Sequence, residues 1–178
     1  KFLEWEEVKA LMNIEVEPGI ENDARDLFVF CCLTAMRYSD VQNLRKTDIK
    51  EHRFDNIKGV QYAAHIRQLK TSKLTVIPLL PEAIAILKKY ENEKTEFALP
   101  QRANQSVNRV LKILGRRARL NALQELIVYR GKECIVTHEP KWKILTTHMG
   151  RRTFATMAAN KGIPINIACS ITGQSPEV

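Results

Sequence analysis

A histidine and two arginines open one predicted helix, in the segment TTHMGRRTFAT at residues 146–156. His148 and Arg151 are three residues apart, so a helix places both side chains on one face. Because a helix N-terminus already favours anions, this cluster is unfavourable there without a negatively charged ligand. A bound phosphate would accept charge-assisted hydrogen bonds from both side chains. The alternative is a solvated helix start, which is the better interpretation of an isolated His-x-x-Arg pattern.

Two further cations occur where a phosphate site could use them. Arg37 directly follows the apolar run LFVFCCLTAM, so we expect it at the end of a buried helix, where the dipole also tolerates a cation. Asp40 either pairs with Arg37 or belongs to the first turn of the next helix. Lys70 is expected near the tip of a β-hairpin, with Lys73 as the alternative if the turn register differs. Each of these residues alone is compatible with an ordinary surface.

The elements that must position these residues are mostly helical. Apolar periodicity predicts helices over residues 2–13, 24–36, 82–92 and 104–120, and two final helices over 147–162 and 164–173. Ser39 and Gln42 form a plausible capping box for a short helix that runs through Leu44. Alternation over residues 60–66 and the run LTVIPL predict a β-hairpin, and residues 124–145 predict a second hairpin or a long loop. The predicted fold class is mainly α with a small antiparallel β-sheet, in one domain over residues 1–178.

The charge of the chain predicts a polyanionic partner. The net charge is +8 and the isoelectric point is about 9.4, and nucleic acid is a more common partner for such an excess than a membrane surface. Much of this charge falls on the predicted helix at 105–119. The four cysteines lack metal-site spacing and are expected to be small buried residues in a reducing compartment. Without a long apolar run, the chain is expected to be intracellular and not membrane-bound.

Taken together, the motifs resemble a known family. The order TAMRYSDVQNL, then KT before VIPL, then THMGRRTFAT, then ITGQS, is similar to the catalytic domain of tyrosine recombinases, the phage integrases. The resemblance extends over essentially the whole chain, and the form RRTFAT resembles integrases of Bacteroides-type mobile elements. It implies the tyrosine recombinase catalytic-domain fold. It also implies site-specific DNA recombination, the integration or excision of a mobile element, through a 3′-phosphotyrosyl intermediate and without metal, ATP or other cofactor.

The resemblance also implies roles for individual residues. Arg37 and Arg151 would neutralise the charge that develops on the phosphate oxygens, which planar guanidinium forks do better than lysine. His148 would assist proton transfer near the phosphate, and Lys70 would protonate the departing 5′-oxygen. Asp40 would support Arg37. The residues expected to contact DNA are Arg109, Lys112, Arg116, Arg152 and Lys73.

Two departures from the family pattern affect the predicted chemistry. Gln174 stands where the family usually has histidine or tryptophan, and glutamine can donate a hydrogen bond but cannot carry a proton between groups. The nucleophilic tyrosine is expected about ten residues beyond Gln174, so the chain is expected to be truncated before it and inactive as given. The tyrosines present are expected to be packing residues: Tyr38, Tyr62, Tyr90 and Tyr129.

The resemblance implies double-stranded DNA as partner, a homotetramer on DNA for the full-length protein, and a cytoplasmic, nucleoid-associated location in a bacterium. Two other interpretations remain open. A non-catalytic DNA-binding module could use the basic helix at 105–119 with two later helices as a helix-turn-helix. A phosphodiesterase could use His148 as a base without a covalent intermediate.

Overall fold

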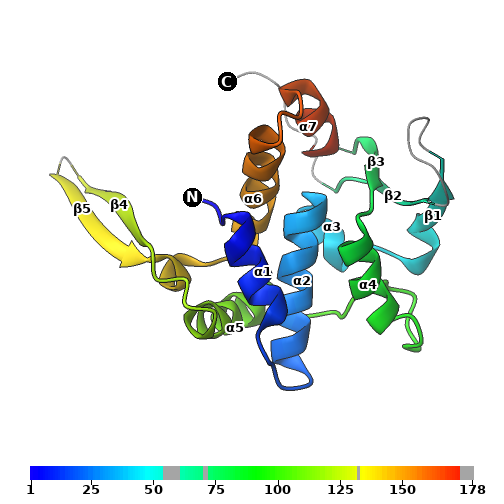
Figure 1. Cartoon of the computed structure of the whole chain (residues 1–178), viewed down its shortest axis with the longest axis horizontal. Helices are drawn as coiled ribbons and strands as arrows, with labels where there is room; N and C mark the ends of the chain where they lie inside the picture. Colours follow the sequence, from blue (N-terminus) through cyan, green and yellow to red (C-terminus); the bar gives the residue numbers. More distant parts are fainter. Residues whose placement is uncertain (54–60, 70–71, 132, 173–178) are drawn as a thin grey trace.

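The computed structural model describes residues 1–53, 61–69, 72–131 and 133–172, and Figure 1 shows the arrangement of the chain. The helices have these bounds: α1 Trp5–Asn13, α2 Ile20–Thr34, α3 Tyr38–Gln42, α4 Pro81–Lys89, α5 Asn104–Arg117, α6 Thr147–Asn160 and α7 Ile165–Thr172. Short 3₁₀ helices are η1 Lys46–Asp48 and η2 Lys141–Ile144. The strands are β1 Ile49–His52, β2 Gln61–Arg67, β3 Leu74–Pro78, β4 Leu123–Arg130 and β5 Glu133–Pro140.

Helix α2 forms the centre of the core. Every residue from Leu27 to Thr34 is buried, as expected from an apolar run on all faces of a helix, and α1, α4, α5 and α6 pack around it. Helix α6 approaches α2 closely because residue 150 is glycine. A Cβ on Gly150 would lie 2.8 Å from the Cβ of Cys31. This contact sets the distance between the C-terminal part of α2 and helix α6, which carries His148 and Arg151.

The predicted cysteine environments are confirmed for two of the four residues. Cys31 and Cys32 are fully buried in α2, where their small side chains allow the approach of α6. The prediction is wrong for Cys134, which is exposed on β5, and only partly right for Cys169, which is half-buried in α7. The strand that carries Cys134 leaves the helical body, so its side chains have no core to enter.

The first sheet contains the predicted hairpin and a strand that the sequence did not indicate. Strands β2 and β3 pair antiparallel, with Ala64 opposite Ile77, and both side chains face the core. Strand β1 adds to the other edge of β2, giving the order β1-β2-β3 among the described residues. The four residues of β1 carry no apolar alternation, so only pairing with β2 makes them a strand.

The second predicted hairpin is confirmed as strands β4 and β5, which pair antiparallel from Leu123 opposite Pro140 to Arg130 opposite Glu133. In Figure 1 this hairpin projects from the helical body, and the β1-β2-β3 sheet lies at the opposite end of the long axis. Leu123 and Tyr129 are largely exposed on it, so Tyr129 is not the packing residue that was expected.

Two local predictions near Arg37 are wrong. Helix α2 ends at Thr34, because Ala35 adopts a left-handed conformation with φ of 57°, so Arg37 does not lie at the end of that helix. Arg37 instead has extended backbone and precedes α3 as its N-cap residue. Ser39 lies inside α3, and no side-chain capping bond is formed there. The Gln42 side chain bonds backbone groups of Pro100 and Arg102 instead of capping α3.

The predicted ends of the last two helices agree better with the structure. Helix α6 ends at Asn160, and Gly162 just beyond it adopts φ of 72°, the left-handed conformation that glycine favours. Helix α7 begins directly after Pro164. Its predicted end at Gly173 lies outside the described residues.

Candidate active site

Arg151 lies in α6, and its guanidinium joins the ends of two other helices. Its Nη1 donates to the carbonyl oxygen of Ala35 at 2.9 Å, and its Nη2 donates to the carbonyl oxygen of Thr172. Ala35 caps the C-terminus of α2 and Thr172 is the last residue of α7, so a cation satisfies carbonyls that their helices leave unpaired. The side chain is held in place, and the residue is only 5% exposed.

Arg37 approaches the same region from the start of α3. Its Nη1 donates to the Gln68 side-chain oxygen at 2.9 Å and lies 3.9 Å from a carboxylate oxygen of Asp40. The other Asp40 oxygen accepts the backbone N–H of Leu69 at 3.0 Å. Asp40 therefore satisfies both alternatives left open by the sequence, since it lies in the first turn of α3 and also faces Arg37. Through these contacts the start of α3 is tied to the end of β2.

Arg37, Arg151 and His148 share one electrostatic environment. Burial, and then the positive charge of Arg37, lower the pKa of Arg151 to about 10, while Asp40 opposes the shift. Arg151 therefore remains a cation at neutral pH. Burial and the positive charges of Arg152, Arg151 and Arg37 lower the pKa of His148. An anion placed among these groups would remove the repulsion that both shifts record.

The N-terminus of α6 is already fixed by side chains of α5. Asn108 accepts the Thr147 N–H at 2.8 Å, and Asn104 accepts the Thr147 hydroxyl at 2.9 Å. His148 follows directly and is exposed. The Thr147 N–H, the first backbone donor of α6, is therefore already bonded to Asn108 of α5. An anion at this site would be bound by the side chains of Arg37, His148 and Arg151 instead.

The remaining predicted site residues divide into three groups. Lys70 and Gln174 lie outside the described residues. Lys73 is exposed directly before β3, and its carbonyl accepts the Gln68 N–H at 3.0 Å. Arg152 is exposed on α6, next to the buried Arg151 in the sequence.

Helix α5 presents the predicted DNA-contacting residues. Arg109, Lys112 and Arg116 are exposed, and within the described residues none of them forms an ion pair. The guanidinium carbon of Arg116 lies 5.8 Å from the centre of the Trp142 ring, which orients it without neutralising it. Arg117 differs, because it binds Glu21 through two hydrogen bonds of 2.5 and 2.8 Å.

Three of the four tyrosines lie in environments that argue against a role as nucleophile. The Tyr38 hydroxyl donates to the Arg102 carbonyl at 2.7 Å, and burial raises its pKa to about 12. Tyr62 packs against the core. Burial and the neighbouring carboxylates of Asp26 and Asp23 raise the pKa of Tyr90. These three are structural residues, as expected from their positions in the sequence.

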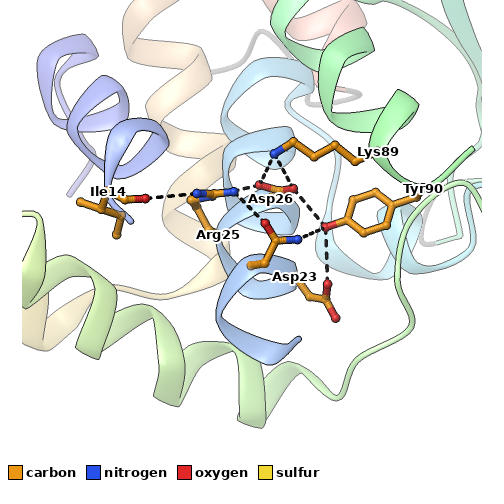
Figure 2. Close-up of polar contacts among 7 residues, drawn as sticks. Ile14, Asp23, Arg25, Asp26, Lys89 and Tyr90 are labelled. Carbon is orange, nitrogen blue, oxygen red and sulfur yellow. Dashed lines mark hydrogen bonds and ion pairs between the residues drawn. The ribbon is translucent and has the colours of Figure 1, made fainter. Parts of the chain in front are cut away.

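The structure also contains a buried polar cluster that the sequence did not indicate, in the N-terminal half of α2 (Figure 2). Asp26 accepts from Arg25, from Lys89 and from the Tyr90 hydroxyl, all within 3.1 Å. Asp23 binds the Arg102 guanidinium at 2.6 Å. The signal was present as two carboxylates three residues apart just before the apolar run of α2, but Lys89, Tyr90 and Arg102 come from distant segments.

The part of the chain that the structure describes contains no helix long and apolar enough to span a bilayer. It also contains no group of three histidine, cysteine, aspartate or glutamate side chains placed to hold a metal ion.

Solved structures with a similar fold are DNA-bound recombinases. The XerH site-specific recombinase bound to difH substrate has a TM-score of 0.67 at 16% identity, over 98% of this chain and 47% of that one. An FLP recombinase–Holliday junction complex has a TM-score of 0.63 at 14% identity, over 96% of this chain and 44% of that one. The Tn1549 transposon integrase with circular intermediate DNA has a TM-score of 0.58 at 19% identity, over 98% of this chain and 57% of that one.

These likenesses establish a shared fold, and the chain spans about half the length of the proteins it matches. No curated protein sequence matches the chain. The special likeness to integrases of Bacteroides-type elements stays a prediction. A sequence model described as the phage integrase family matches residues 1–175. With the fold, this match covers nearly the whole chain, which therefore belongs to the phage integrase family.

Proposed function

We propose that this chain is the catalytic domain of a tyrosine-type site-specific recombinase that integrates or excises a mobile element. The observation that carries the proposal is the convergence of Arg37 and Arg151, with only partial compensation by Asp40, in a chain of net charge +8. Two fixed guanidiniums suit a phosphodiester, since each can donate two parallel hydrogen bonds to phosphate oxygens.

In the proposed cleavage step a tyrosine hydroxyl attacks the phosphorus, and the bond from phosphorus to the 5′-oxygen breaks. Arg37 and Arg151 stabilise the charge on the non-bridging oxygens, and their preset positions limit reorganisation during the reaction. Lys70 gives a proton to the departing 5′-oxygen, while His148 accepts a proton or a hydrogen bond near the attacking hydroxyl. Rejoining reverses these transfers, with the 5′-hydroxyl of a partner strand as nucleophile.

The nucleophile is proposed to lie beyond residue 178 in the natural protein. Support comes from Tyr62, which packs against the core, and from the hydroxyls of Tyr38 and Tyr90, which are engaged in hydrogen bonds. Gln174 would position the phosphate by donating a hydrogen bond. The full-length protein is proposed to act as a homotetramer on double-stranded DNA in the bacterial cytoplasm.

The proposal is tested with a nicked suicide DNA substrate, which traps a covalent protein–DNA complex after cleavage. The protein from the complete natural reading frame should give a DNA-linked band on a denaturing gel, and residues 1–178 should give none. Changing the proposed downstream tyrosine to phenylalanine should remove the band. A complex trapped with residues 1–178 alone, and lost in Tyr129→Phe, would place the nucleophile within this chain and overturn the assignment.

DNA contacts are proposed for α5, because Arg109, Lys112 and Arg116 are exposed and unpaired within the described residues. Binding of residues 1–178 to duplex DNA should weaken with salt, with the logarithmic slope falling by roughly 0.9 for each phosphate contact removed. The double change of Arg109 and Lys112 to glutamine should lower that slope. Arg117→Gln is the matched control on the same helix, because its charge is already paired with Glu21. An equal effect of both variants would contradict this interface.

A further inference from the structure

The first turn of α6 is capped by side chains from another helix. The Thr147 N–H donates to Asn108 Oδ1 of α5 at 2.8 Å, whereas Thr146, the residue before the helix, makes no side-chain capping bond. The Thr147 hydroxyl donates to Asn104 Oδ1 at 2.9 Å, and Thr147 is only 5% exposed. A helix commonly takes its capping oxygen from the residue directly before it, so this arrangement makes the start of α6 depend on α5.

The hydrogen bonds among these three residues have one consistent direction. The Thr147 N–H is a donor, so Asn108 must present its side-chain oxygen to it. The Asn108 side-chain nitrogen then donates to Asn104 Oδ1 at 3.2 Å, and the same oxygen also accepts the Thr147 hydroxyl. Asn104 and Asn108 are four residues apart and lie on one face of α5. An alanine at either position would remove a partner from the buried Thr147.

The cap joins two helices to which different DNA contacts are assigned. Asn108 directly precedes Arg109, an exposed cation that is proposed to contact DNA. Thr147 directly precedes His148, which lies in the electrostatic field of the candidate active-site arginines. The hydrogen bond from Thr147 to Asn108 therefore connects the backbone beside one proposed contact to the side chain beside the other.

Arg151, one turn further along α6, is held by other contacts. Its guanidinium donates to the carbonyl oxygens of Ala35 and Thr172, and Gly150 packs closely against Cys31 of α2. Loss of the cap should therefore loosen the first turn of α6, which carries His148, and leave Arg151 in place.

We infer that Asn104 and Asn108 are positioning residues that hold His148 in a fixed orientation relative to the DNA-contacting face of α5. The inference rests on the proposed function and extends it, because it assigns a role to two residues outside the sequence motifs. Neither asparagine contacts the reacting atoms, and both act on His148 through Thr147.

The first test is a double-mutant cycle in the full-length protein, measured as single-turnover cleavage of the suicide substrate at saturating DNA. Asn108→Ala is combined in turn with His148→Ala and with Arg37→Ala. Asn160→Ala changes an exposed asparagine at the other end of α6 and is the matched control. Asn108→Asp is the conservative replacement, because it keeps an oxygen that can accept the Thr147 N–H.

Asn108→Ala should slow cleavage by roughly tenfold, as expected for a lost capping bond. The same change should have little effect in the His148→Ala background, because the group that it positions is absent. In the Arg37→Ala background it should again slow cleavage by roughly tenfold, because Arg37 is held by other contacts. Asn108→Asp should restore most of the rate, and Asn160→Ala should cleave like the wild type.

The second test does not depend on cleavage and uses residues 1–178. Burial and the positive charges of neighbouring arginines lower the pKa of His148. A loosened first turn relieves the burial, so the His148 pKa should rise toward its ordinary value in Asn108→Ala and stay unchanged in Asn160→Ala. NMR titration of the imidazole Cε1–H measures the shift, with the exposed His138 as internal reference.

The inference is overturned if Asn108→Ala cleaves at the wild-type rate, or if it slows cleavage equally with and without His148. An unchanged His148 titration in Asn108→Ala would also overturn it. If the His148→Ala background cleaves too slowly to measure, the titration decides. Failure of the wild-type protein to cleave would instead count against the proposed function, and the titration would still test the cap.

A second variant covers the case in which Asn108→Ala does not fold, as judged by circular dichroism. Thr147→Val then takes its place in both tests, because it loses only the hydroxyl bond to Asn104. Thr147→Ser keeps the hydroxyl and should behave like the wild type. Equal losses in Thr147→Val and Thr147→Ser would separate the effect from this bond and would overturn the inference.

Discussion

Two clusters of charged groups lie near the two ends of helix α2, but only the cluster in its N-terminal half is balanced. There, Asp26 binds Arg25 and Lys89 (Figure 2). Asp23 binds Arg102 at 2.6 Å, so each carboxylate has at least one cation. At the C-terminal end, Arg151 binds two backbone carbonyls, and Arg37 binds an amide and reaches Asp40 only at 3.9 Å.

The difference separates a structural cluster from a candidate binding site. When both charges of a buried ion pair are present and hydrogen-bonded, their mutual attraction offsets the desolvation cost, so no ligand is required to balance them. At the other end, burial and then the positive charge of Arg37 lower the pKa of Arg151, and an anion would remove the repulsive part of this cost. Perturbed groups of this kind occur at functional sites more often than in structural clusters.

The largest expected effect is on cleavage by the Arg37→Ala variant of the full-length protein. Single-turnover cleavage should fall by about 10²- to 10³-fold, because a preset donor to the phosphate charge is removed. The free energy of unfolding of residues 1–178 should change by no more than about 1 kcal/mol, since a partly exposed cation without a close carboxylate contributes little to stability. Urea denaturation checks the second value, and a loss of several kcal/mol would make Arg37 a structural residue.

The opposite result is expected at the other end of α2. Asp26→Ala should lower the free energy of unfolding by about 3 kcal/mol, because the largely buried Arg25 and the Tyr90 hydroxyl both lose a carboxylate partner. Urea denaturation of residues 1–178 measures the change. Glu6→Ala, which breaks the exposed pair with Lys9, is the control and should change it by less than about 0.5 kcal/mol. An Asp26→Ala protein as stable as the control would remove the contrast between the two clusters.

A smaller effect is expected from sulfate, which mimics the phosphodiester. At ten times its dissociation constant, sulfate should stabilise residues 1–178 by about 1.4 kcal/mol through mass action. The stabilisation should disappear in Arg37→Ala and persist in Asp26→Asn, measured by thermal unfolding against chloride at equal ionic strength. Equal stabilisation of both variants would mean that sulfate binds elsewhere.

The smallest effect is a shift of the His148 titration. In the free chain its pKa is lowered, so the folded state binds fewer protons than the unfolded state just below pH 6.5, and stability falls as the pH drops through that range. Sulfate should raise the His148 pKa, so sulfate binding should strengthen as the pH falls. NMR titration of the imidazole Cε1–H reports this shift, with the exposed His138 as internal control. An unchanged His148 titration in saturating sulfate would place the anion away from this residue.

Most of the helical framework follows from local sequence. The apolar run of α2 and the left-handed Gly162 after α6 have local physical causes, so their positions were predicted to within a few residues. Arg37, His148 and Arg151 were selected as candidate site residues from their types and spacing, which are properties of the sequence, and their roles stay predictions. Strand β1 was missed because its only cause is pairing with β2.

What the sequence determined by itself was therefore most of the helices, the two hairpins, the excess of positive charge and the candidate residues for phosphate binding. Tertiary structure alone decided which charges are paired. Arg117 meets Glu21 and Arg102 meets Asp23, whereas Arg37 meets Gln68. Each partner lies in a distant segment, and its distance depends on how α2, α5 and the β2–β3 hairpin pack. Because charge compensation depends on distances of a few ångströms, it is fixed only when the core forms.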